Sequence, residues 1–428
     1  MKSMFRISII FGKIVMTFLH LIGRGGSALP GLFVERVNAN YLKDLRAVLP
    51  KGVLMVTGSN GKTTTTKVIA AIFESTGLAV LTNKTGSNFR RGIIAASLED
   101  ATWTGRIKKD IAILEVDEGH APLLAKMLRP KLLVALNVFR DQLDRYGELD
   151  TTASKIEQAA KYAREIIVNS DDPSLAPLLA SQYAAKAKSF GATPEIQKLL
   201  PHDGVLHQST FKPIDNNPQT LLEKIAPSDD NLIITIKQGD QRFNFETKLT
   251  GAHNAINLTA VIAVCEAAHL DINESIKTIS RTDPAFGRGE IINWHGHEVN
   301  LQLVKNPAGF NQVITSLNST KVGCLVVAIN DQIADGRDVS WLWDVSIAKI
   351  KKWHHKPDSI ITTGSRAYDM ALRFKYDNMT YSSKININSV FSDLEPGTGN
   401  ITVIATYTSM LEIRRLLVRE SNAKEFWK

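Results

Sequence analysis

A glycine-rich loop with one lysine gives the strongest chemical signal in the sequence. Residues 52–66 read GVLMVTGSNGKTTTT, in which an apolar run before the loop predicts a buried strand and KVIAAIFEST after it predicts a helix. Such a loop cradles phosphate, because its backbone N–H groups point at the oxygens, the lysine adds a cation and the next threonine offers a hydroxyl group to Mg²⁺. The residues expected to hold phosphate are Gly58, Ser59, Asn60, Gly61, Lys62, Thr63 and Thr64.

Acidic side chains follow two further apolar strands. Residues 110–117 read DIAILEVD, and a buried strand that ends in a carboxylate places it where α/β nucleotide enzymes hold their metal. We therefore expect Glu115 to bind Mg²⁺, with Asp117 or Glu118 in reserve. The strand KLLVALN at 131–137 precedes VFRDQLDRYGELD, a charged segment that by itself could equally be a salt-bridged surface turn.

Composition and charge indicate a folded protein of two or three domains. Of 428 residues, 44% are hydrophobic and 22% charged, which excludes a chain disordered over most of its length. The net charge is +8, and residues 1–46 hold seven basic against two acidic residues, so we expect no nucleic-acid partner, because the excess is local. Cys265 and Cys324 stand in apolar sequence without a CxxC pair, which predicts two buried thiols.

The first 24 residues, MKSMFRISIIFGKIVMTFLHLIGR, are apolar and basic. Lys13 interrupts them, which leaves too short an apolar stretch to cross a bilayer, and no clear signal-peptide cleavage pattern follows. The segment therefore predicts an amphipathic helix. We expect it to pack on the next domain, and peripheral contact with a membrane surface stays open as the alternative.

Several motifs, in this order, resemble those of the Mur ligase superfamily, whose members form amide bonds through an acyl phosphate. They are TGSNGKTTT at 57–65, NVFRDQLDRYGELD at 137–150, VNSDDP at 168–173, GAHNAINLTAVIAV at 251–264 and FGRGE at 286–290. Other segments are similar to the MurT family in particular. These are LPG at 29–31, DQLD in place of DHLD, KNPAGFN at 305–311, NDQIADGRDVSWLWD at 330–344, TGSRAYDMALR at 363–373 and YTSM at 407–410.

The resemblance implies an α/β fold with a Mur ligase-like central P-loop ATPase domain. The apolar runs CLVVAIN at 324–330, SIITTG at 359–364 and ITVIAT at 401–406 alternate with expected helices, which predicts a C-terminal Rossmann-like domain. We expect a helical lead at 1–46, the central domain at 47–284 with an insert near 191–245, and the C-terminal MurT-type domain at 285–428. Many MurT proteins carry a four-cysteine zinc ribbon in the insert. This insert has no cysteine, so no zinc is expected.

The resemblance also assigns residues to ATP and Mg²⁺. Thr63 and Glu115 are the expected metal ligands, Asn254 approaches the adenine and Arg288 is a candidate phosphate contact. Gln142 stands where other members have histidine, which puts a second Mg²⁺ in doubt. From the residues alone, Arg90 and Arg91 could meet a lipid-linked pyrophosphate or simply be a solvated pair.

The implied activity is the ATP-dependent amidation of lipid II at the α-carboxylate of stem-peptide D-glutamate, giving D-isoglutamine. Ammonia would come from a GatD-type glutamine amidotransferase in a heterodimer, because neither cysteine here is placed as a nucleophile. Asp338, in DGRD, would complete the catalytic triad of that partner, although it could also cap the helix after it. The catalytic candidates are therefore Lys62, Glu115 and Asp338. The expected location is the cytoplasm, and a position at the inner face of the membrane stays open.

Two other functions fit the same nucleotide motif. One is a stand-alone Mur-type ligase, or a folylpolyglutamate synthase-like ligase, which adds an amino acid and needs no partner. The other is a nucleotide-bound scaffold without catalysis. The presence of Lys62, Thr63 and Glu115 together argues against the scaffold, which has little need of all three.

Overall fold

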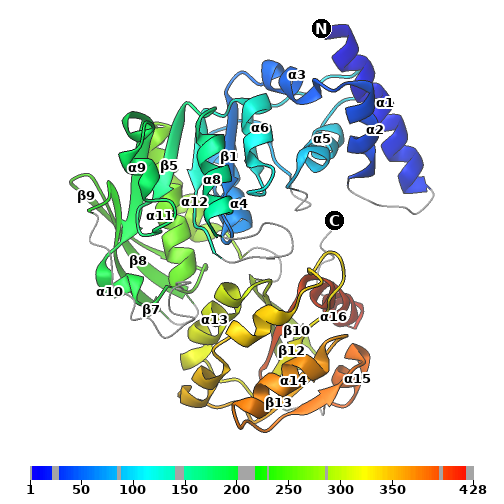
Figure 1. The fold of residues 1–428 in the computed structure, drawn as a ribbon, viewed down its shortest axis with the longest axis vertical. Helices are drawn as coiled ribbons and strands as arrows, with labels where there is room; N and C mark the ends of the chain where they lie inside the picture. The colour runs from blue at the N-terminus through cyan, green and yellow to red at the C-terminus, as the bar shows by residue number, and fades with distance from the viewer. Residues whose placement is uncertain are drawn as a thin grey trace.

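Two β-sheets, one above the other in Figure 1, organise the protein. The computed structural model describes residues 2–21, 28–83, 88–139, 149–200, 217–228, 231–284, 288–394 and 399–420. Within these ranges the upper sheet has nine strands and the lower sheet has six.

The nine-stranded sheet has the order β2-β3-β1-β4-β5-β6-β7-β8-β9. Strands β2 to β7 run parallel and β7 to β9 are antiparallel. Their bounds are β1 Gly52–Thr57, β2 Val80–Leu81, β3 Ile111–Glu115, β4 Leu132–Ala135, β5 Glu165–Asn169, β6 Ala187–Ala192, β7 Thr220–Ser228, β8 Asn231–Gln238 and β9 Gln241–Thr247. The described part of the expected insert thus extends the main sheet.

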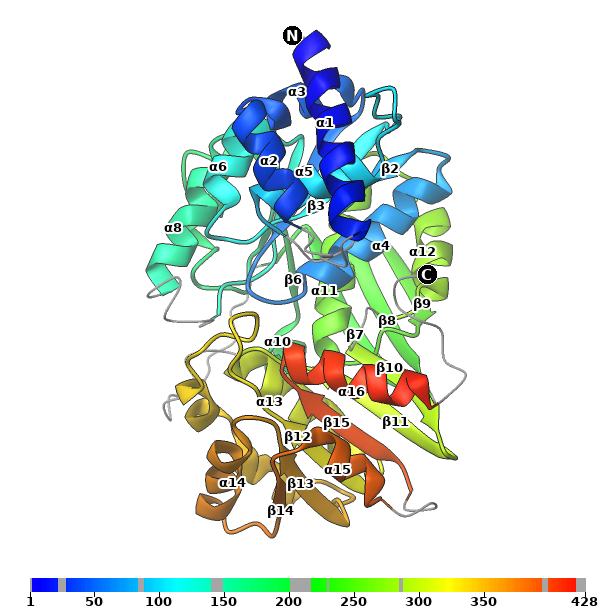
Figure 2. The ribbon, with the colours of Figure 1, turned by 90° about the vertical axis from the view of Figure 1, so that its right-hand side faces the viewer.

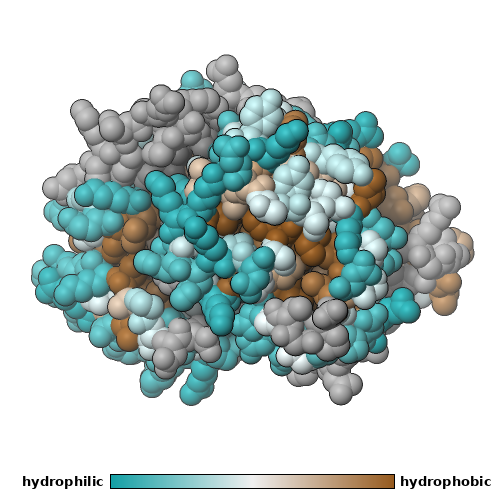
Figure 3. Space-filling model, turned by 90° about the horizontal axis from the view of Figure 1, so that it is seen from below, coloured by the Kyte–Doolittle hydropathy of each residue, from teal (hydrophilic) through white to brown (hydrophobic). Residues whose placement is uncertain are grey.

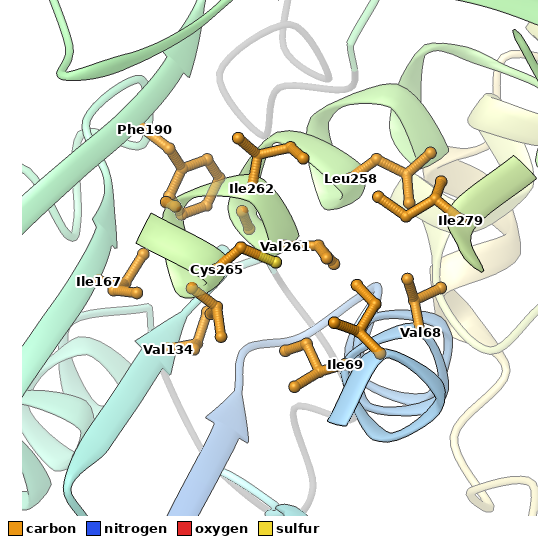
Figure 4. Packing of buried hydrophobic residues seen from close by; sticks show 14 of the residues in the cluster. Val68, Ile69, Val134, Ile167, Phe190, Leu258, Val261, Ile262, Cys265 and Ile279 are labelled. Atoms are coloured by element: carbon orange, nitrogen blue, oxygen red, sulfur yellow. The ribbon is translucent and has the colours of Figure 1, made fainter. Parts of the chain in front are cut away.

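Helices cover both faces of this sheet, because its central strands are apolar on both sides. On β1, Leu54 and Val56 pack into one core cluster, whereas Val53 and Met55 pack into the other. The first cluster lies under α4 (Lys62–Ser75), α11 (Ala252–Ala267) and α12 (Ile272–Arg281), and Figure 4 shows α4 and α11 meeting there. The second lies under α3 (Tyr41–Val48), α5 (Arg90–Glu99), α6 (Ala121–Leu128) and α8 (Leu149–Ala160).

Helices α1 (Lys2–Leu21) and α2 (Leu29–Val37) pack against α5 at the N-terminal end of the molecule (Figure 1). Phe5 and Ile9 of α1 are buried, and Lys13 donates hydrogen bonds to the carbonyl oxygens of Leu98 and Ala101 at 3.0 and 2.6 Å. Burial lowers the pKa of Lys13. The expected packing of this segment on the next domain is confirmed.

The six-stranded sheet has the order β10-β11-β15-β12-β13-β14 and is parallel except for the β10–β11 pair. The strands are β10 Arg288–Trp294, β11 His297–Leu303, β12 Cys324–Ala328, β13 Ser359–Thr363, β14 Ser382–Lys384 and β15 Ile401–Ala405. Helices α13 (Pro307–Ser316) and α14 (Ala367–Tyr376) cover one face, and α15 (Ile387–Ser392) and α16 (Tyr407–Arg419) cover the other (Figure 2).

Both cysteines lie in these cores, one under each sheet, as the sequence predicts. Cys265 and Cys324 are each 1% exposed and unbridged. Burial raises the pKa of the Cys265 thiol to about 11, so it stays protonated at neutral pH. The boundaries that we expected for the three parts of the chain remain our proposal.

A buried carboxyl group closes the end of β5. Asp171 Oδ2 accepts a hydrogen bond from the backbone N–H of Ala192 at 2.7 Å. Burial, with a smaller contribution from the neighbouring Asp172, raises the pKa of Asp171 to about 7. Because the folded protein then holds this proton more tightly than the unfolded chain, stability falls as pH rises from about 4 to about 7 and levels off above that range.

We therefore expect Asp171→Asn to raise the free energy of unfolding at pH 8, by at most about 4 kcal/mol, and to change it little at pH 4. The amide oxygen can still accept from Ala192. Asp172→Asn is the control, because Asp172 accepts from the backbone N–H groups of Val138 and Ser174, and an amide can satisfy only one of them. Urea unfolding at pH 4 and pH 8 measures the free energy of unfolding. If Asp171→Asn and Asp172→Asn lose equal stability at pH 8, the prediction is wrong.

Candidate nucleotide-binding site

The glycine-rich loop runs from the end of β1 to the start of α4, as predicted. Gly58 and Gly61 have φ angles of +133° and +86°, which side-chain-bearing residues rarely adopt. A Cβ on Gly58 would lie 2.9 Å from the backbone nitrogen of Asn137, and one on Gly61 would collide with the side-chain amide of Asn257. Both glycines are therefore required by the neighbours that pack on the loop.

Residues after β4 hold this loop in shape. The backbone N–H of Asn60 donates to Asn137 Oδ1 at 2.8 Å, and Asn137 Nδ2 donates back to the carbonyl oxygen of Asn60 at 3.0 Å. Ser59 Oγ accepts from the backbone N–H of Phe139 at 2.9 Å. These bonds fix the loop before any phosphate arrives, which is the preorganisation that an anion site needs.

Lys62 lies at the start of α4 and is buried. Its ammonium group donates to the carbonyl oxygen of Gly58 and forms an ion pair with Glu118, with 3.0 Å between Nζ and Oε1. Each side chain of this pair is 6% exposed. From the sequence we expected Glu118 to be a reserve metal ligand, whereas the geometry makes it the counter-charge of Lys62.

Thr63 and Glu115 meet beside this lysine. Thr63 Oγ1 donates to Glu115 Oε2 at 2.8 Å. The side-chain amide of Asn83 donates to the carbonyl oxygen of Glu115 at 2.9 Å and accepts from its backbone N–H at 3.0 Å. A hydroxyl and a carboxylate oxygen are ligands that Mg²⁺ accepts while keeping waters and phosphate oxygens for its other positions, so the pair fits the ion. Within the described ranges, no group of three or more His, Cys, Asp or Glu side chains could hold a metal.

Helix α11 reaches the loop from the opposite side. Asn254, the expected adenine contact, is 8% exposed and donates from Nδ2 to the carbonyl oxygen of Thr250 at 2.8 Å. Asn257, one turn further along, packs on Gly61. We did not single out Asn257 from the sequence, although the spacing of the two asparagines on a helix puts them on one face.

The C-terminal part of the chain contacts the same loop. Asn306 caps α13 by accepting from the N–H of Gly309 at 2.8 Å, and its amide exchanges hydrogen bonds with the amide of Asn60 at 3.3 and 3.5 Å. Lys67 of α4 donates to the carbonyl oxygens of Asp283 and Pro284, just before β10. The two sheets are thus tied together next to the phosphate loop.

The remaining candidates are placed as follows. Asp338 lies in the loop after β12, and its Oδ1 accepts from the backbone N–H of Ser340 at 2.8 Å. This bond closes a turn before the short 3-10 helix Ser340–Asp344, whose N-cap is Val339, so Asp338 is not the helix cap that we considered. Arg90 and Arg91 both form ion pairs with Glu35, at 2.8 and 2.9 Å, so each already has an acidic partner within the protein. Gln142 and the side chain of Arg288 lie outside the described residues.

Comparison with known proteins first defines the class. The Mur ligase middle domain model matches residues 56–265, and the MurT ligase C-terminal model matches residues 303–410. Among solved structures, MurF from Acinetobacter baumannii superposes with a TM-score of 0.65 at 15% identity, covering 90% of this chain and 80% of that one. A folylpolyglutamate synthase from Thermotoga maritima gives 0.61 at 14% identity, covering 90% and 93%. The fold is that of the Mur ligases, as the sequence predicted.

Relatives in sequence are more specific. Subunit MurT of the lipid II isoglutaminyl synthase (glutamine-hydrolyzing) from Staphylococcus aureus is 30% identical over 383 residues, covering 83% of this chain and 84% of the relative. The protein of the same name from Streptococcus pneumoniae is 28% identical over 427 residues, covering 93% and 94%. The chain therefore belongs to the MurT family, which confirms the resemblance stated from its motifs.

We expect Glu115→Gln to lower the affinity for ATP about tenfold or more when Mg²⁺ is present, because a neutral amide is a weaker Mg²⁺ ligand than a carboxylate. Affinity measured in a chelator should change little, since the phosphate loop is untouched. Calorimetric titration with and without Mg²⁺ tests this. Asp117→Asn, at the reserve position, is the matched control and should bind ATP normally. If Asp117→Asn, and not Glu115→Gln, shows the Mg²⁺-dependent loss of ATP affinity, Asp117 is the metal ligand instead.

Proposed function

We propose that this chain is the ATP-dependent synthetase subunit of a lipid II isoglutaminyl synthase. The observation that carries the proposal is the intact phosphate cradle with Lys62, Thr63 and Glu115 in a member of the MurT family. The substrate would be the α-carboxylate of D-glutamate in the stem peptide, and the product D-isoglutamine.

The reaction would proceed in two steps. A carboxylate oxygen attacks the γ-phosphorus of ATP and ADP leaves, which gives an acyl phosphate. Ammonia then attacks the acyl carbon, the C–O bond to phosphate breaks, and the nitrogen loses a proton as the amide forms. Both partners of the first step are anionic, so catalysis depends on charge neutralisation and alignment.

The residues of the cradle supply these needs. The N–H groups of Gly58 to Thr64 and the ammonium of Lys62 would hold the phosphates, for which the lysine exchanges its present acceptors for phosphate oxygens. Mg²⁺ on Thr63 and Glu115 would supply further positive charge at the β- and γ-phosphates. Asn254 would approach the adenine and Arg288 the phosphates, roles carried over from the family motifs.

Ammonia would be delivered by a GatD-type glutamine amidotransferase in a heterodimer, in the cytoplasm. Asp338 is half-buried, and its Oδ1 already accepts from Ser340, which holds the carboxylate in one orientation. A carboxylate held in this way can orient a histidine of a partner. Exposed aromatic residues stand in the same domain, with Trp343 50% and Tyr376 67% exposed, and hydrophobic residues show between hydrophilic ones on this end of the molecule (Figure 3).

The first experiment is amidation of purified lipid II with ATP, followed by mass spectrometry. Ammonium chloride should support product with this chain alone, whereas glutamine should support it only when the amidotransferase is added. If neither nitrogen source gives product and a free amino acid is ligated instead, the chain is a stand-alone Mur-type ligase.

Asp338→Asn separates the synthetase from the glutaminase role. The amide still accepts from Ser340 but carries no charge, so we expect glutamine-dependent amidation to fall about a hundredfold or more while ammonium-dependent amidation stays unchanged. Asp358→Asn, an exposed aspartate of the same domain, should leave both reactions intact. Equal loss with both nitrogen sources would make Asp338 a structural residue only.

A further inference from the structure

Helix α1 has a second apolar face that nothing in the described part of the chain covers. Its exposed apolar side chains are Met4, Ile7, Ile14, Phe18 and Leu21, which are 52–81% exposed. In Figure 2 the helix lies at the front of the molecule with no other element over it. Buried Phe5 and Ile9 already anchor the opposite side, so these five residues are not needed for packing.

The five residues form one continuous stripe. At 100° per residue their positions fall within an arc of about 100°, and the buried positions point to the other side of the helix. A stripe of this width over the whole length of a 20-residue helix is typical of helices that lie flat in a membrane interface. The described part of the chain has no helix long and apolar enough to cross a membrane.

The charged residues of α1 itself are all basic. The exposed acids Glu99 and Asp100 lie near Lys13, and Asp100 is paired with Lys109. The first 34 residues contain no Asp or Glu, and Arg6 on α1 is exposed. Beside the helix, Trp103 is 59% exposed, with Lys13 Nζ 5.4 Å from its ring centre. The loop of Trp103 also presents Arg106 and Lys108 to solvent. Tryptophan and basic side chains are enriched where a protein meets lipid headgroups.

We propose that the stripe on α1 is a docking surface for an anionic lipid bilayer. The proposal rests on the function above, because lipid II is itself a membrane lipid and docking would hold the enzyme where its substrate is. A second copy of the chain is a poorer occupant, since two α1 helices face to face would bring their basic residues together and α1 itself has no Asp or Glu to pair with them.

The test is sedimentation of the full chain with vesicles of phosphatidylcholine alone or mixed with phosphatidylglycerol. We expect binding to the anionic vesicles that weakens as salt is raised. Ile14→Glu with Phe18→Glu should reduce binding about tenfold or more. Both positions are exposed, so the fold should persist, which circular dichroism checks.

Ile291→Glu on β10 is the matched control, because Ile291 is 57% exposed and Ile14 is 56% exposed. It should bind vesicles like the wild type. The proposal is overturned if the wild type does not sediment with anionic vesicles or if the double variant binds equally well. It is also overturned if light scattering shows that the wild type is a dimer and the double variant a monomer, while neither protein binds vesicles.

Amidation assays separate this inference from the proposed function. The double variant should amidate a soluble stem peptide like the wild type but work more slowly on lipid II in anionic vesicles. Equal rates on vesicles would overturn docking and leave the proposed function standing. If the wild type binds vesicles but amidates neither substrate, the proposed function is overturned and docking stands.

Discussion

The close packing around the phosphate loop is the constraint on which the site depends. Gly58 touches the backbone after β4, Gly61 touches Asn257 of α11, and Asn137 bonds both the N–H and the carbonyl of Asn60. These contacts come from two separate elements, the segment after β4 and helix α11. The order β3-β1-β4 is what brings them together, since both neighbours of β1 end at the same edge. The sheet therefore fixes the loop, and the loop fixes where phosphate can bind.

Charged side chains lie buried at the same edge of the sheet. Lys62 and Glu118 are buried as a pair, and Thr63 bonds Glu115 next to them. A buried ion pair contributes little to stability by itself, because desolvation of both charges offsets their attraction. Its presence is explained better by chemistry, since an anionic ligand can take over a cation that the fold has already placed.

Local sequence pattern predicted the loop, the helix after it and the carboxylate at the end of β3, because an apolar run, glycines and one lysine stand within a few residues. It could not predict that Asn60 meets Asn306, a contact across 246 residues, or that Lys62 pairs with Glu118. Amides and ion pairs leave no periodic signal, so their partners emerge only from the fold. Arg90 and Arg91 illustrate this, because their common partner, Glu35, lies on another helix. The second sheet could be predicted from its apolar runs at 324–330, 359–364 and 401–406, which contain β12, β13 and β15.

The contact between Asn60 and Asn306 has a consequence for turnover. Its two hydrogen bonds are long, at 3.3 and 3.5 Å, and join neutral groups. Water can replace each of them at a net cost of only about 0.5–1.5 kcal/mol. This contact by itself would therefore oppose a separation of the two sheets only weakly when a bulky substrate enters.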